Sequence, residues 1–124
     1  MTTYKDAGVD VESTDALVEN ISLLSKSTIR KGNIDTIGGF GGIFDLKKCG
    51  YTDPLLVSGT DGIGTKIILG IETNKLDRLG YDLVGMCLND ILCHGADPLF
   101  FLDYYASSKV DKKSFLRIIK SITE

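Results

Sequence analysis

The chain has 124 residues, 43% of them hydrophobic and 25% charged, which is the composition of one soluble globular domain. Its formal net charge is −3 and it has no long run of basic residues, so DNA and RNA are not expected as its main partners. The three cysteines lack CxxC spacing and no apolar run approaches the roughly 18 residues of a membrane span. A disulfide framework, a zinc site and a membrane protein are therefore not expected, and a cytoplasmic protein is.

The first predicted element is an amphipathic helix. Three residue types that favour the N-cap position stand together at positions 13–15. Leu17, Ile21 and Leu24 then recur at helical spacing. The pattern predicts a helix that continues to about Ser27.

A strand and a glycine-punctuated turn are predicted in the middle of the chain. After a segment with four glycines in the five positions 38–42, the apolar run Pro54–Thr60 reads as a short strand. Its proline stands at the start, where a missing N–H is tolerated. The turn at residues 61–66 follows directly, and the apolar segment 67–71 after it can form a helix.

The last third of the chain contains the strongest helical pattern, at residues 79–94, which Gly95 is predicted to end. The run Leu99–Ala106 is rich in aromatic residues and reads as a second strand. Asp111 can cap a last helix. The order helix, strand, helix, strand, helix predicts an α/β or α+β fold, in which helices pack a small mixed sheet.

The turn at residues 59–66 has the composition of a phosphate-binding site. Two of its glycines have P-loop separation, but Thr65 stands before Lys66, so the segment is not a Walker A motif. Glycines allow backbone N–H groups to approach an anion, Lys66 adds a positive charge, and Asp61 can hold a hard cation. The alternative is a structural turn with Asp61 and Lys66 on the surface.

Three further polar residues are candidates for a functional site. Asp90 lies beside the apolar stripe of the predicted helix and could share a magnesium ion with Asp61, because Mg²⁺ sites typically use one or two carboxylates together with phosphates. The alternative is that Asn89 and Asp90 form an exposed pair on the helix surface. Asp103 lies either at a strand edge or at a functional position. His94 could tune Asp90 or act as a base, or it is a structural residue near the helix end.

Five blocks of sequence stand in one order along nearly the whole chain. They are Tyr4–Asp10, Gly38–Gly42, Ser58–Lys66, Asp82–Asp90 and Pro98–Tyr105. Together they resemble the family of phosphoribosylformylglycinamidine cyclo-ligase, also called aminoimidazole ribonucleotide synthetase. The block with Asp61 and Lys66 is the most diagnostic of the five.

The resemblance implies a reaction and a site. Enzymes of this family use ATP and Mg²⁺ to close the imidazole ring of formylglycinamidine ribonucleotide, which yields aminoimidazole ribonucleotide in purine biosynthesis. Asp61 and Asp90 are then expected to coordinate Mg²⁺. His94 stands where related sequences commonly have glutamine, and no catalytic residue is assigned. The expected nucleotide-binding residues are Gly62, Gly64, Thr65 and Lys66 in the turn, Gly39, Gly41 and Gly42 in the other glycine loop, and Lys5, Asp6 and Asp10 in an N-terminal segment that closes over the nucleotide.

The resemblance also implies a homodimer, with strands of the two subunits forming a β-barrel. Residues 1–124 are then expected to be an amino-terminal domain for ATP binding and dimerisation, incomplete at its C-terminal end and without the second α/β domain of the family. Such a piece is expected to be inactive alone, because a water-excluding site cannot form. The alternatives are a non-catalytic dimerisation domain, or a related ATP-dependent enzyme such as formylglycinamidine synthetase, selenophosphate synthetase or thiamine-phosphate kinase.

Overall fold

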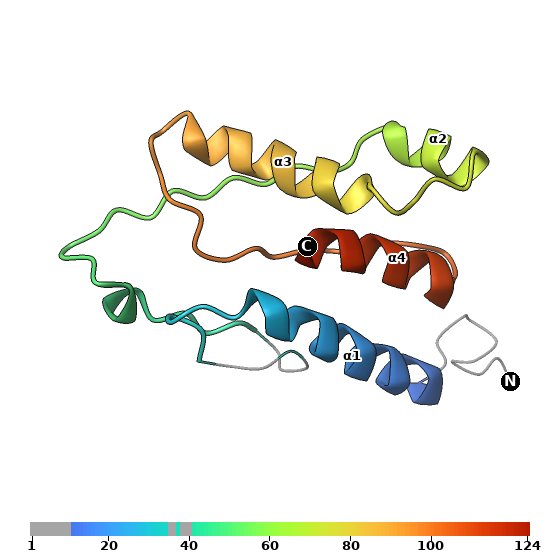
Figure 1. The fold of residues 1–124 in the computed structure, drawn as a ribbon, viewed down its shortest axis with the longest axis horizontal. Coiled ribbons are helices and arrows are strands. Elements are labelled where there is room, and N and C mark those ends of the chain that lie inside the picture. Colours follow the sequence, from blue (N-terminus) through green and yellow to red (C-terminus); the bar gives the residue numbers. More distant parts are fainter. Residues whose placement is uncertain (1–10, 35–36, 38–40) are drawn as a thin grey trace, which may run out of the picture.

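The computed structural model of the chain describes residues 11–34, 37 and 41–124, and it consists of helices joined by long irregular segments (Figure 1). Two short 3₁₀ helices are η1 (Lys26–Thr28), directly after the first α-helix, and η2 (Leu46–Cys49). The α-helices of the described part are α1 (Val11–Ser25), α2 (Lys66–Glu72), α3 (Leu79–Leu92) and α4 (Lys112–Thr123).

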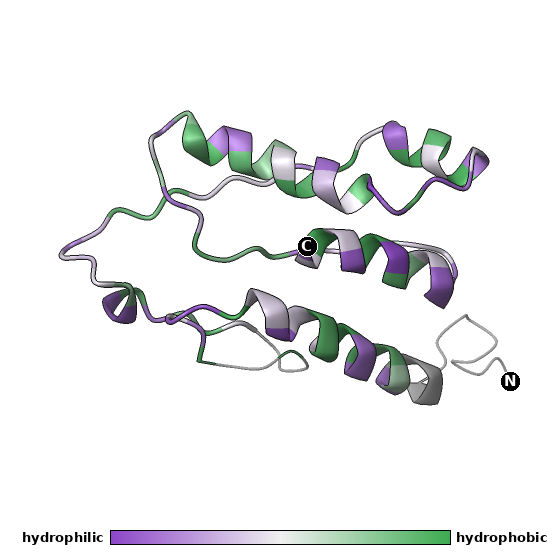
Figure 2. Ribbon diagram, viewed as in Figure 1, coloured by the Kyte–Doolittle hydropathy of each residue, from purple (hydrophilic) through white to green (hydrophobic). Residues whose placement is uncertain are grey.

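Helix α4 lies between α1 and α3 (Figure 1), and its buried residues form much of the core. Hydrophobic and hydrophilic residues alternate along it, as Figure 2 shows. Phe115 packs with Leu17 of α1, whereas Ile118 packs with Leu76 in the loop before α3 and with Leu79, the first residue of α3. Burying a large apolar side chain stabilises a fold by about 1.5–3 kcal/mol, so the two sides of α4 tie α1 and α3 into one structure.

Gly80 allows α3 and α4 to approach each other closely. A Cβ atom at this position would lie 2.5 Å from the backbone nitrogen of Ile122 and 2.7 Å from the carbonyl oxygen of Ile118. The Gly80 N–H donates to the Ser121 hydroxyl at 3.0 Å, and that hydroxyl donates to the Ile118 carbonyl at 2.8 Å. The contact therefore buries a polar group with its partners in place.

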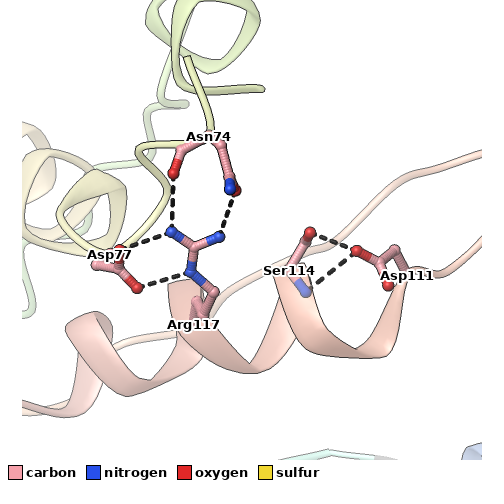
Figure 3. Close-up of polar contacts among 5 residues, drawn as sticks. All are labelled: Asn74, Asp77, Asp111, Ser114 and Arg117. Atoms are coloured by element: carbon pink, nitrogen blue, oxygen red, sulfur yellow. Dashed lines mark hydrogen bonds and ion pairs between the residues drawn. The ribbon is translucent and has the colours of Figure 1, made fainter. Parts of the chain in front are cut away.

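Arg117 joins α4 to the loop between α2 and α3 (Figure 3). Its Nε and Nη2 atoms donate to the two carboxylate oxygens of Asp77, at 2.7 and 2.6 Å. Nη1 donates to the Asn74 side-chain oxygen at 2.7 Å, and Nη2 also donates to the Asn74 carbonyl at 2.9 Å. The hydrogen bonds from Arg117 hold the pKa of Asp77 below its usual value. This planar, bidentate geometry needs arginine and could not be reproduced by lysine.

The structure confirms the helices predicted in the second half of the chain. Helix α3 ends near the predicted position, and Gly95 has the left-handed φ of 68° typical of a residue that follows a helix. Asp111 caps α4, because its side chain accepts from the Ser114 N–H at 3.3 Å (Figure 3). The predicted cap at residues 13–15 is wrong, since α1 already begins at Val11. Ser, Thr and Asp are tolerated inside a helix, and their preference for caps is only a weak signal.

The predicted fold class, a small mixed sheet with strands that form a β-barrel, is wrong. Pro54–Thr60 and Leu99–Ala106 are irregular, and the described residues contain no strand beyond an isolated antiparallel bridge between Asn33 and Phe44. Apolar and aromatic residues favour an extended chain, but a strand exists only where a second segment pairs with its N–H and C=O groups. Leu55 is instead 96% exposed.

The helices of the described part include none with both the length and the apolar character needed to cross a membrane.

Candidate functional site

The predicted phosphate turn lies against α3. A Cβ atom on Gly59 would lie 3.3 Å from the Cβ of Asp90 and 3.5 Å from Cγ2 of Ile91. Further along the turn, the sulfur of Cys87 is 3.8 Å from the carbonyl oxygen of Asp61. One side of the helix carries all these contacts, because Asp90 and Ile91 follow Cys87 by three and four residues. The turn therefore runs along the side of α3 from which Asp90 projects.

Both candidate metal ligands, Asp61 and Asp90, are exposed. The Asp61 carboxylate accepts a hydrogen bond of 2.7 Å from the N–H of the next residue, Gly62. This local bond fixes the side chain beside its own backbone. It also engages the Gly62 N–H, one of the amides that the sequence assigns to a phosphate.

The donor set fits a hard cation that a ligand helps to hold. Asp61 and Asp90 offer carboxylate oxygens, the donors that Mg²⁺ prefers, and Mg²⁺ is usually bound by one or two carboxylates plus substrate phosphates. In the described part of the chain, no three His, Cys, Asp or Glu side chains gather in an arrangement able to hold a metal ion. A metal at this position thus depends on oxygens that a phosphate ligand brings.

Lys66, the predicted phosphate-binding cation, is the first residue of α2. Its ammonium nitrogen lies 3.1 Å from a carboxylate oxygen of Asp82 in the first turn of α3. The two side chains are 53% and 44% exposed, so water screens the pair only in part. The sequence analysis missed Asp82 as a partner of Lys66, because only the placement of α2 beside α3 brings the two together.

The remaining residues of the turn set its shape. Gly64 has a φ of 70°, in the left-handed region that other residues rarely adopt. Its carbonyl accepts from the Ile67 N–H at 3.3 Å, and the Thr65 carbonyl accepts from the Ile68 N–H at 3.1 Å, which starts α2. Thr65 makes no side-chain cap of this helix. Gly64 is therefore required by the backbone, whatever ligand the turn binds.

The other predicted glycine loop is not brought to this turn. Gly41 and Gly42 are exposed, and the segment after them is bonded to residues 32–34, with the Ile34 N–H donating to the Ile43 carbonyl at 3.1 Å. The turn at 59–66 instead contacts α3 (Figure 1). Other predicted nucleotide-binding residues lie outside the described part of the chain. These are Lys5, Asp6, Asp10 and Gly39.

The sequence analysis also named His94 and Asp103 as candidates. His94 is exposed just after α3, where its backbone N–H donates to the Ile91 carbonyl at 3.0 Å. Asp103 lies in the irregular segment that follows, and desolvation raises the pKa of its carboxyl group. Tyr105 of the same segment packs on Phe115 with ring centroids 4.3 Å apart, which is a packing role.

A shallow hollow beside the first turn of α3 also contains titratable groups. Tyr81 donates a hydrogen bond to Glu124 there, and this bond raises the pKa of the Tyr81 hydroxyl. None of the residues that the sequence assigned to a site lines the hollow. Its lining residues are Asp77, Arg78, Tyr81, Asp82 and Glu124.

The model of one protein family matches the chain. Its description is "AIR synthase related protein, N-terminal domain", and the match covers residues 46–124. This range includes α2, α3, α4 and the whole turn at residues 59–66. The contact between the turn and Asp90 lies within the matched part, whereas α1 and the other glycine loop lie before it.

Proposed function

The chain belongs to the family of AIR synthase related proteins, and from this membership we propose that its turn at residues 59–66 and α3 together form the magnesium–ATP site of a cyclo-ligase. The reaction proposed is ATP-dependent ring closure of formylglycinamidine ribonucleotide to aminoimidazole ribonucleotide. Family membership itself is consistent with a synthetase or ligase. The finer assignment depends on the five sequence blocks that resemble the cyclo-ligase and on the site described above.

The observation that carries the proposal is the contact of Gly59 with Asp90. It sets the turn that bears Asp61 on the same side of α3 as Asp90, with the Asp61 carbonyl 3.8 Å from Cys87 one turn earlier in the helix. Two carboxylates from separate elements can then converge on one ion.

Each residue has a defined role in this proposal. Asp61 and Asp90 hold Mg²⁺, which neutralises phosphate charge when it is bound. Lys66 supplies a point charge to the phosphates, and the backbone of Gly62 and Gly64 allows the phosphates to approach closely. In the structure the Gly62 N–H donates to the Asp61 carboxylate, so it can donate to a phosphate only after that carboxylate has turned toward the metal.

Isothermal titration of Mg-ATP tests the proposal. The wild-type protein should release or absorb heat on binding, and Asp61→Asn and Asp90→Asn should each weaken binding by about tenfold or more, equivalent to roughly 1.4 kcal/mol. Asparagine keeps the shape of the side chain but removes the charge that a hard cation requires. Asp15→Asn is the matched control, since Asp15 is exposed on α1.

Two results would contradict the proposal. Absence of any binding heat with the wild-type protein would leave a non-catalytic role as the better account. Wild-type affinity in both Asp61→Asn and Asp90→Asn would place the nucleotide elsewhere on the molecule.

A further inference from the structure

The cation of the proposed site already has a partner. The Lys66 ammonium nitrogen is 3.1 Å from the Asp82 carboxylate. Lys66 begins α2 and Asp82 belongs to the first turn of α3, so the pair connects two separate helices. An anionic ligand that uses Lys66 has to compete with this carboxylate.

The pair also holds the ammonium at one end of α3. The turn contacts this helix at Cys87 and Asp90, five and eight residues after Asp82. At a rise of 1.5 Å per residue, Asp90 lies about 12 Å further along the helix axis than Asp82. As long as the ion pair is closed, Lys66 is directed to the start of α3 and away from the level at which Asp90 projects.

We propose that Asp82 is a competing counter-ion that lowers the affinity of the phosphate site by holding Lys66, and that the Lys66–Asp82 pair opens when Mg-ATP binds. This inference rests on the proposed function. Both side chains are about half exposed, and exposed ion pairs are weak, so the pair can be displaced. Arg78 lines the same hollow as Asp82, so the carboxylate still has a cation nearby after Lys66 has left.

A double-mutant cycle on Mg-ATP binding tests the inference. Asp82→Asn should tighten binding by about two- to fivefold, the range expected for release of an exposed ion pair. Lys66→Met should weaken binding. In the Lys66→Met background, Asp82→Asn should give little or no gain, because the competition has been removed.

Two further variants separate the ion pair from general charge effects. Glu72→Gln removes one negative charge from α2, where Glu72 is exposed, and should leave the affinity close to that of the wild-type protein. Asp82→Glu keeps the negative charge at the pair and should not reproduce the gain. Circular dichroism of each variant checks that the helices are retained.

The outcomes distinguish the two proposals. If the wild-type protein binds Mg-ATP but Asp82→Asn binds it equally or more weakly, the inference is wrong and the proposed function stands. If Asp82→Asn gives the same gain with Lys66→Met as without it, the effect is not that of the ion pair, and the inference is again wrong. If neither the wild-type protein nor Asp82→Asn binds Mg-ATP, the proposed function fails and the inference fails with it.

Discussion

Gly59 determines how closely the phosphate turn approaches α3. A Cβ atom on Gly59 would lie 3.3 Å from the Cβ of Asp90, which is a tight contact, so a side chain at this position would require Asp90 or the turn to shift by a few tenths of an ångström. Asp61 follows two residues later, and its carboxylate is held by the N–H of Gly62. At the scale of single residues, the site therefore depends on a missing side chain as much as on the charged ones.

Asp103 gives a residue-scale prediction about pH. Desolvation raises the pKa of its carboxyl group above the ordinary value, so the folded state binds this proton more tightly than the unfolded state. This tighter binding stabilises the folded protein at pH values below the pKa that Asp103 has in the unfolded chain. The stabilisation is lost as the pH rises through the pKa that Asp103 has in the folded protein. Because Asp103 is nonetheless exposed to solvent, the effect should be small: Asp103→Asn should be slightly more stable than the wild-type protein at pH 7, and the difference should shrink toward about pH 4.

Urea denaturation of both proteins across this pH range provides the measurement. A variant that is less stable than the wild-type protein at pH 7, or a difference that stays constant down to low pH, would show that desolvation of Asp103 does not act on stability.

The packing of helix α3 against helix α4 depends on Gly80. Gly80→Ala would place a methyl group within 2.7 Å of backbone atoms of α4, which cannot move as a flexible side chain can. The free energy of unfolding should fall by about 1–3 kcal/mol, the usual cost of overpacking a core. Gly85→Ala is a matched control on the same helix, since nothing lies within 4 Å of a Cβ there. Because alanine favours a helix over glycine by about 0.8–1.0 kcal/mol, this control should stabilise the protein.

Chemical denaturation of Gly80→Ala and Gly85→Ala measures both effects. Equal changes in the two variants would mean that the approach of α3 to α4 is not as close as described.

The sequence predicted helices better than strands for a physical reason. Asp111 accepts a hydrogen bond from an N–H three residues away, and α3 ends before Gly95 because glycine readily adopts a positive φ. Both signals can therefore be recognised from a few neighbouring residues of the sequence. Pro54–Thr60 and Leu99–Ala106 have strand-like composition, but a strand requires a partner that composition does not specify. The helices followed from local chemistry, whereas the predicted sheet depended on pairing between distant segments.

In the whole molecule, the candidate site likewise combines residues that could be predicted from local sequence with contacts between distant segments that could not. Residue types and spacing named Asp61, Lys66 and Asp90 as candidates. The ion pair of Lys66 with Asp82 was not predictable, because it depends on how the loop after α2 turns and on how Arg117 fixes that loop to α4. The pairing of the segment after Gly42 with residues 32–34, shown by the bond of the Ile34 N–H to the Ile43 carbonyl, was also a property of the complete fold.

The central claim is that Asp61 and Asp90 share one metal ion in the nucleotide complex. Replacing Mg²⁺ with paramagnetic Mn²⁺ and recording amide NMR spectra tests it most directly, since Mn²⁺ takes similar oxygen ligands and broadens only nearby signals. Substoichiometric Mn-ATP should broaden the amides of Gly62 and Ile91 together, leave those around Asp15 on α1 sharp, and lose its effect when excess Mg-ATP is added. Because the turn and α3 are in contact, broadening of both amides shows only that the ion is near, and sharing is tested by the variants: Asp61→Asn and Asp90→Asn should each remove the broadening at both amides. Broadening that persists in either variant, or that is absent from the wild-type protein, would contradict the shared site.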